Sequence, residues 1–332
     1  MAVNQKGIAV AGSLIADLVY TTDTYPSPGF LANILEQTWN VGGSGNMILD
    51  LAKMDPELPV KVSAVIGEDA AGNMLWETLN SFPNIETDNI MRGGLSSVTH
   101  VIHPADTKQR TFFFQAEASN RYDESYIDWE KLSADIFVLE YLLLMKKVDE
   151  PDDEYGTHGA RILHDAQQRG MKTAIDVVSE QGDRAKSIVK PALKYTSYCV
   201  INELEAEAIT DIAVNADNVA IVLKEIREMG VSDWVVIHTA SDAYGLDCRN
   251  DSIVHVPSLS LPDDYIKGNT GAGDAFCSGI LYGAYSGMDL ETSIRFAVAS
   301  AACSLSELNG TDGLRSASLI WELEAKYRKT DH

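Results

Sequence analysis

Gly271-Ala272-Gly273-Asp274 opens a run of small and apolar residues that continues through 275–281 as AFCSGIL. A small-residue turn that leads into an apolar run is typical of a helix start, and a single carboxylate lies at this junction. The first turn of a helix has N–H groups without intrahelical partners and a partial positive charge, so it binds anions, and glycine lets a phosphate approach the backbone. An aspartate would repel a bound phosphate, so Asp274 is better explained as a base that takes a proton from an attacking hydroxyl. The stretch favours phosphoryl transfer to an alcohol, with a tight turn before a buried helix as the structural alternative.

The composition narrows the class of protein. The 332 residues are 45% hydrophobic and 23% charged, which is typical of a globular protein of one large α/β domain or two smaller ones. A net charge of −23 argues against nucleic-acid or anionic-membrane binding, because both require basic patches. The four cysteines lie far apart without a CxxC pair, which favours free thiols in a reducing compartment. No apolar run approaches the roughly 20 residues of a membrane span, and residues 1–6 lack a signal pattern, so we expect a cytoplasmic protein.

Short apolar runs alternate with longer segments of helical periodicity along most of the chain. The predicted strands are residues 7–12, 60–66, 136–139, 173–177, 198–201 and 234–237, and the predicted helices include 46–54, 157–169, 218–229 and 290–305. This alternation predicts an α/β fold with a mostly parallel central sheet and helices on both faces. Residues 13–39 and 97–114 lack that periodicity and are interpreted as extended segments. We expect them to form a small β-sheet lid over one end of the main sheet.

A second glycine-rich helix entry lies early in the chain, at Gly42-Gly43-Ser44-Gly45-Asn46, before the amphipathic segment 47–54. It is not a dinucleotide fingerprint, because the third glycine is absent, and it is not a Walker A loop, because the Gly-Lys-Ser/Thr ending is missing. Glycines at this position let a polar ligand such as a sugar lie against the backbone.

A third motif, Asn202-Glu203-Leu204-Glu205, follows the predicted strand 198–201. Polar residues at the carboxyl end of a parallel strand face the crevice in which α/β proteins bind ligands. A carboxylate there suits Mg²⁺ held through water, because this ion keeps most of its hydration shell.

These three motifs, in this order, resemble those of the ribokinase-like, or PfkB, family of carbohydrate kinases, and the resemblance covers nearly the whole chain. It implies a ribokinase-like fold, with residues 1–12, 40–96 and 115–332 in the α/β core and residues 13–39 and 97–114 in the β-lid. It also implies ATP-dependent phosphorylation of a hydroxymethyl group of a sugar, with ATP and Mg²⁺ as cofactors. A nucleoside kinase of the same family, and a sugar-sensing relative that binds without turnover, stay open as alternatives.

The resemblance also implies a role for individual residues. Asp274 would deprotonate the acceptor hydroxyl, and the N–H groups of Gly271, Ala272 and Gly273 would hold the transferring phosphoryl group. The sugar pocket would consist of Asp17, Gly42, Gly43 and Asn46, and the nucleotide site of Asn202, Thr239 and Ser241, with Glu205 ordering the water shell of Mg²⁺. For Asp17, a turn or cap residue is the structural alternative.

The chain departs from the family pattern at three places. Gly268 and Asn269 stand where the late motif usually begins Asp-Thr, and that aspartate helps to bind an activating monovalent cation, so dependence on K⁺ is open. The loop 238–243, which supplies Thr239 and Ser241, has alanines where two glycines are usual. Ser44 stands where ribokinases often carry a lysine, so the sequence does not identify ribose as the acceptor.

Several other residues have plainer interpretations. Arg92, Arg110 and Arg121 are expected at the solvated surface, which favours an unphosphorylated acceptor. Tyr141 is expected in the core, and the run 112–114 is expected in the lid core or in a subunit contact rather than in base stacking. Because an exposed lid edge can pair with a second copy, the sequence also predicts a homodimer through the lid.

Overall fold

The fold is built on a mostly parallel sheet, in a computed structural model that describes residues 6–107, 109–179 and 182–328. Within these residues nine strands pair in the order β15-β14-β13-β12-β11-β8-β1-β4-β5. The strands are β1 (Ile8–Gly12), β4 (Val60–Ile66), β5 (Ile85–Arg92), β8 (Ile136–Leu142), β11 (Lys172–Val177), β12 (Tyr198–Asn202), β13 (Trp234–His238), β14 (Asp242–Asp247) and β15 (Ser252–Pro257). Only the last two run antiparallel to their neighbours.

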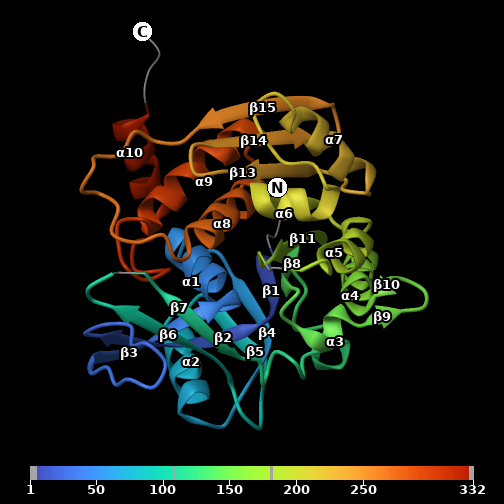
Figure 1. The fold of residues 1–332 in the computed structure, drawn as a ribbon. Coiled ribbons are helices and arrows are strands. Elements are labelled where there is room, and N and C mark those ends of the chain that lie inside the picture. Colours follow the sequence, from blue (N-terminus) through green and yellow to red (C-terminus); the bar gives the residue numbers. More distant parts are fainter. Residues whose placement is uncertain (1–5, 108, 180–181, 329–332) are drawn as a thin grey trace.

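Helices cover both faces of this sheet (Figure 1). One face packs against α1 (Ser44–Met54), α2 (Ala70–Asn80), α8 (Ala272–Tyr285), α9 (Leu290–Ser304) and α10 (Ala317–Tyr327). The other packs against α3 (Lys146–Asp149), α4 (His158–Gln168), α5 (Ala185–Leu193), α6 (Glu203–Thr210) and α7 (Val219–Glu228). Successive residues of a strand point to opposite faces, so Ile8 and Val10 enter one core while Ala9 and Ala11 enter the other. The short elements β9 (Pro151–Asp152), β10 (Gly156–Thr157) and the 3₁₀ turn η1 (Glu124–Tyr126) connect these units.

A separate small sheet forms the lid, with the order β3-β2-β6-β7 in the described part of the chain (Figure 1). Its strands are β2 (Leu14–Thr22), β3 (Ile34–Gly43), β6 (Ser97–Pro104) and β7 (Thr111–Gln115). β2 follows the carboxyl end of β1 after one residue, which places the small sheet beside the carboxyl edge of the main sheet. The strands lie within residues 14–43 and 97–115, so β3 extends four residues past the predicted lid boundary at 39. The ends of the predicted core, residues 1–5 and 329–332, lie outside the described residues.

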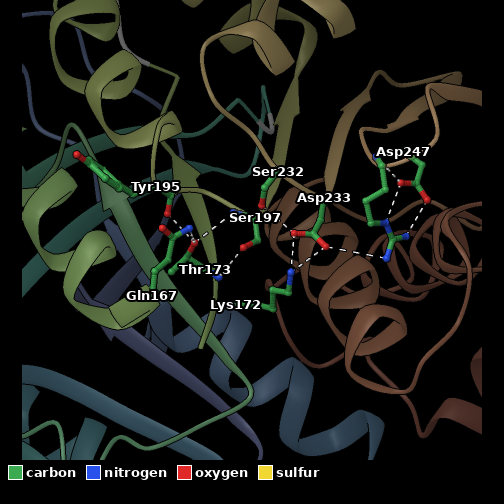
Figure 2. A network of polar contacts seen from close by, with 9 residues as sticks. Gln167, Lys172, Thr173, Tyr195, Ser197, Ser232, Asp233 and Asp247 are labelled. Carbon is green, nitrogen blue, oxygen red and sulfur yellow. Dashed lines mark hydrogen bonds and ion pairs between the residues drawn. The ribbon is translucent and has the colours of Figure 1, made fainter. Parts of the chain in front are cut away.

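The opposite, amino edge of the main sheet is held by a polar network at the start of three strands, which Figure 2 shows. Lys172 Nζ contacts the two carboxylate oxygens of the buried Asp233 at 3.0 and 2.9 Å. Thr173 and Ser197 exchange hydrogen bonds between their backbone and hydroxyl groups across β11 and β12. The polar groups of this network bond to one another, so the network has a structural role. Parallel sheets bind ligands at their carboxyl edge, which is the opposite edge.

The predicted fold class is confirmed: the sheet is mostly parallel, helices cover both faces, and a small mixed sheet stands apart. The six strands and four helices predicted from periodicity all form, with ends that shift by three residues at most. In the described part of the chain, no helix combines the length and the apolar character that a membrane crossing requires.

Candidate active site

A cavity of about 580 Å³ lies where the carboxyl ends of the parallel strands meet the lid and the start of α8. Strand ends contribute Tyr141, Asp176, Asn202 and His238, the first two from the last residues of β8 and β11. The full lining is Ile15, Asp17, Gly43, Thr99, Phe112, Tyr141, Leu144, Asp176, Val177, Val178, Ser179, Val200, Asn202, Glu205, His238, Asn269, Gly273, Asp274 and Cys277. The three motifs of the sequence thus meet at one cavity.

The late motif forms the start of α8, as its pattern predicts. Gly271 is the residue before the helix and adopts a left-handed conformation with φ 76°, and no side chain caps the helix. A Cβ at Gly271 would lie 2.5 Å from the Cα of Gly310, so only glycine fits. Gly273 and Asp274, in the first helical turn, line the cavity. An uncapped helix start that opens into a cavity is a site for an anion.

Both carboxylate oxygens of Asp274 are held by hydrogen bonds from distant parts of the chain. Asn46 Nδ2, in the first turn of α1, donates to Oδ2 at 2.8 Å, and the Tyr141 hydroxyl donates to Oδ1. Burial raises the pKa of Asp274 above its usual value, and the hydrogen bonds from Tyr141 and Asn46 offset part of this rise. The expected sugar residue Asn46 therefore contacts the predicted base itself, from a side chain that is almost fully buried.

Tyr141 is buried, as the sequence predicts, but it does more than fill the core. Its ring packs at the carboxyl end of β8, but its hydroxyl reaches the cavity and contacts Asp274. The sequence shows only an aromatic residue at the end of an apolar run, and nothing local indicates a partner that lies 133 positions later.

Asp17 lies at the lid side of the cavity, in the middle of β2. It pairs with Asn40 on β3 and with Thr99 on β6. Burial raises its pKa to about 6, against a hydrogen bond from Thr99 and the charge of Arg110, which lower it, while Asp274 raises it further. Gly42 faces this carboxylate: a Cβ there would lie 2.4 Å from Asp17 Oδ2. The missing side chain at Gly42 makes room for the Asp17 carboxylate.

Gly43 is the turn between β3 and α1, and it lines the cavity. Its φ is 60°, and a Cβ would lie 2.2 Å from the carbonyl oxygen of Ser13. This glycine lets the lid strand turn directly into the helix that carries Asn46.

Asn202 and Glu205 start α6 with a reciprocal capping box. Asn202 Oδ1 accepts from the N–H groups of Leu204 and Glu205 at 2.9 Å, and Glu205 Oε2 accepts from the N–H of Asn202 at 3.0 Å. Both residues also line the cavity, and Glu205 Oε1 accepts from Ser179 Oγ at 2.7 Å. Burial raises the pKa of Glu205 despite these hydrogen bonds. The motif has a structural role and faces the site at the same time.

Thr239 and Ser241 form the turn between β13 and β14. Thr239 Oγ1 accepts from the N–H groups of Ser241 and Asp242, at 3.2 and 3.0 Å. Neither residue is among the lining residues of the cavity, although the adjacent His238 is. Burial lowers the pKa of His238 to about 4, so its ring is neutral at physiological pH.

Arg110 is not at the solvated surface, which corrects the interpretation from the sequence. It precedes β7 on the lid, is half-buried, and contacts Thr270 Oγ1 immediately before the turn into α8. Its Nη2 also donates to the carbonyl oxygen of Leu308 at 2.7 Å. Phe112 lines the cavity and stays more than half exposed, so the run 112–114 is not lid core.

Acidic side chains surround Asp274. The buried Asp50, Glu140 and Asp176 have pKa values raised well above the usual range, first by burial and then by each other or by Asp274. Their raised pKa values favour the protonated form and so limit the negative charge around the base. Among the described residues that line the cavity there is no Lys or Arg, and the guanidinium of Arg110 acts on Asp17 without lining the cavity. An anion bound here would meet the helix start of α8 as its main source of positive charge.

Carboxylate oxygen is the donor type that Mg²⁺ prefers, and the cavity holds such oxygens at Glu205 and Asp176. In the described ranges, no group of three or more His, Cys, Asp or Glu side chains is arranged to hold a metal ion.

Fold and site together define a class: an α/β protein in which an uncapped helix start and a hydrogen-bonded carboxylate face one cavity beside a small β-sheet. The chain belongs to the pfkB family of carbohydrate kinases, whose family model matches residues 5–317.

Individual relatives either have low sequence identity to this chain or match only part of it. The bifunctional protein HldE of Rhodopseudomonas palustris is 25% identical over 96% of this chain and 63% of its own length. Adenosine kinase of Saccharomyces cerevisiae is 31% identical over 37% of each chain. This chain thus spans less than two thirds of either relative. The structure of Arabidopsis thaliana ribokinase complexed with ribose and ATP has a TM-score of 0.80 at 18% identity, covers 96% of this chain and 99% of that one, and shows a shared fold.

Proposed function

We propose that this protein transfers the terminal phosphoryl group of ATP to a hydroxymethyl group of a sugar. One observation supports this most: the Asp274 carboxylate lies in the first turn of an uncapped helix and faces the same cavity as Asp17. A hydroxyl held by Asp17 and a phosphate held by the turn 271–273 would meet beside this carboxylate. Membership of the pfkB family supports the same reaction.

The proposed step conserves its atoms and charge. The acceptor oxygen attacks the γ-phosphorus while its proton passes to Asp274, and the bond to the oxygen between the β- and γ-phosphorus breaks, so that ADP leaves. The N–H groups at 271–273 would hold the equatorial oxygens of the phosphoryl group as it transfers. Asp17, Gly42 and Gly43 would bind the sugar, with Asn46 behind the base.

The nucleotide side of the proposal uses Asn202 and Glu205, with Thr239 and Ser241 near the adenine end. Glu205 would order the water shell of Mg²⁺, which when bound neutralises charge on the β- and γ-phosphates. Arg110 contacts Thr270, next to the departures from the family pattern at Gly268 and Asn269, and dependence on a monovalent cation stays open. Cytoplasmic location also belongs to the proposal, because all four cysteines carry free thiols.

A nucleoside is the second candidate acceptor. The observation that favours it is the pair of aromatic side chains on the acceptor side of the cavity, Phe112 and Tyr141, because an aromatic face suits a base. The match to adenosine kinase over part of the chain supports the same alternative.

A homodimer through the lid is a further part of the proposal. The outer strands of the small sheet keep large apolar side chains exposed: Ile34, Leu35 and Trp39 on β3, and Phe112, Phe113 and Phe114 on β7. Burying such an edge against a second copy removes both the apolar surface and the unpaired strand. Sedimentation of the wild type and of Phe113→Asp tests this, and a monomeric wild type contradicts it.

The reaction is tested by ADP release with Mg-ATP against pentoses, hexoses, ketoses, sugar acids and nucleosides, with and without K⁺. We expect turnover on one member, lowered by about 10²–10⁴-fold in Asp274→Asn, with acceptor binding kept. Turnover that survives in Asp274→Asn contradicts the assigned base. Silence across the panel, with thermal stabilisation by a sugar but not by ATP, would instead identify a sensor.

A further inference from the structure

Tyr141 is joined to Asp274 although the two residues come from different elements and lie far apart in the sequence. Tyr141 belongs to β8, and its hydroxyl contacts Asp274 Oδ1 at the start of α8. The same hydroxyl oxygen lies 3.4 Å from the carbonyl oxygen of Gly43, at the turn into α1. The phenol therefore stands between the base and the backbone of the acceptor pocket.

Packing alone does not explain a tyrosine here. The side chain is 9% exposed, so a phenylalanine would fill the same space, and only the hydroxyl distinguishes the two. A buried hydroxyl needs a partner, and this one finds it at the carboxylate that faces the cavity. Burial and the surrounding carboxylates raise the pKa of Tyr141 well above its usual range, so the phenol keeps its proton and donates throughout the physiological range.

The arrangement also favours one form of Asp274. A hydroxyl that donates to Oδ1 and an amide that donates to Oδ2 stabilise the ionised carboxylate, which accepts on both oxygens, and so act against the burial that raises the pKa of Asp274. An ionised carboxylate has about four lone-pair positions, so two remain free after these contacts. Those two are available to an acceptor hydroxyl.

We propose that Tyr141 is a positioning residue that holds Asp274 ionised and oriented, with Asn46 as its counterpart on the other oxygen. This inference rests on the proposed function, because it assigns the phenol to the same base. It adds a residue that acts through the carboxylate, without itself taking the proton.

Other ionisable groups surround Asp274 among the described residues. Those coupled electrostatically to it are Asp17 on β2, Asp50 on α1, Glu140 on β8, Asp176 on β11, Glu205 on α6 and Cys277 on α8 itself, and His238 on β13 lines the same cavity. All of them remain in a Tyr141→Phe variant. A difference in titration between this variant and the wild type therefore reports the phenol.

The kinetic test compares Tyr141→Phe with Tyr122→Phe across pH 5 to 9. Tyr122 is a matched control, because it is also a fully buried tyrosine with a hydroxyl partner, Ser63, but does not line the cavity. In Tyr141→Phe we expect kcat/KM at neutral pH to fall about 10- to 100-fold, the range for a lost hydrogen bond to a charged group. The acid limb of the profile should move up by about one pH unit. The KM of the acceptor should stay near the wild-type value, and Tyr122→Phe should keep the wild-type profile.

A second measurement does not depend on turnover. In protein labelled with ¹³C at the Asp carboxyl carbons, the resonance missing in Asp274→Asn identifies Asp274, and its titration gives the pKa directly. We expect a higher pKa in Tyr141→Phe than in the wild type or in Tyr122→Phe. Equal pKa values in all three proteins, or an unshifted pH–rate profile in Tyr141→Phe, overturn the inference. If the wild type phosphorylates no acceptor, the proposed reaction fails, and the titration still decides whether Tyr141 controls Asp274.

Discussion

Arg110 on the lid contacts Thr270 on the loop that leads into α8, so its guanidinium joins the small sheet to the start of this helix. Its second contact, from Nη2 to the carbonyl oxygen of Leu308, ties the lid to the loop after α9 as well. The guanidinium also acts on the charge of Asp17 within the lid. One side chain thus acts on Asp17 in the lid and contacts the loop before α8.

Replacing Arg110 with glutamine should weaken closure of the lid over the acceptor. We expect the acceptor KM to rise about tenfold, in line with a lost hydrogen bond to a charged group, and ATP hydrolysis without acceptor to increase relative to transfer, because an open lid admits water. Steady-state kinetics of both reactions measure this. Arg92→Gln is the control, since Arg92 lies on β5 and contacts Asn73 rather than the site. An unchanged ratio of transfer to hydrolysis in Arg110→Gln argues against a role for Arg110 in closing the lid.

Tyr141 and Arg110 show where prediction from the sequence stops. Asp274, Gly271 and Gly43 were predictable, because glycine at a helix entry and a carboxylate in its first turn are local patterns. The contacts of Tyr141 and Arg110 join residues 133 and 160 positions apart, and no local pattern encodes them. The main fold was predictable for the same reason, since the alternation of short apolar runs and helical periodicity is local. The lid boundary at residue 39 was less predictable, because β3 continues through Gly43 without a break before α1.

Acceptor binding should depend on the ionisation of Asp17, whose pKa is raised to about 6. An ionised carboxylate accepts hydrogen bonds from hydroxyl groups, so affinity for the acceptor should increase as pH rises from 5 to 7, and level off above. The acceptor Kd measured by calorimetry across this range, in the absence of ATP, checks the expectation. Asp17→Asn should bind more weakly at pH 7 and lose the pH dependence. The same pH dependence in the variant would assign it to another group.

A comparison of Gly271 and Gly287 distinguishes the stability cost of a left-handed backbone from the cost of a steric clash. Both have a left-handed backbone, with φ 76° and 74°, but a Cβ at Gly271 would meet the backbone of Gly310 at 2.5 Å, whereas nothing lies within 4 Å of one at Gly287. Gly287→Ala should cost about 1 kcal/mol of unfolding free energy, from φ alone. Gly271→Ala should cost more and should also abolish turnover, since the start of α8 must shift. Urea denaturation and kinetics of the two variants check this, and equal costs would contradict it.

Asp50 should make the protein less stable as pH rises. It is fully buried, and neither of its carboxyl oxygens has a hydrogen-bond partner among the described residues. Burial and then Asp274 raise its pKa well above the usual range, while Lys53 lowers it. The folded state therefore holds this proton above the unfolded pKa of about 3.9, so the contribution of Asp50 is fully present below that pH and is lost as pH rises toward the folded value. The substitution Asp50→Asn removes this pH-dependent contribution to the free energy of unfolding.

Urea unfolding of the wild type and Asp50→Asn at pH 5, 6.5 and 8 measures the effect. The free energy of unfolding of the wild type relative to the variant should fall with pH, by at most about 1.4 kcal/mol per pH unit. Asp69→Asn provides a control that should show no trend between pH 5 and 8: although burial raises the pKa of Asp69, hydrogen bonds from Ser96 and Gly72 lower it overall, below the unfolded value of about 3.9. The stability that Asp69 contributes is present above its unfolded pKa and is lost as pH falls through the lowered folded value. A difference for Asp50→Asn that stays constant across the three pH values would show that this carboxyl ionises alike in both states.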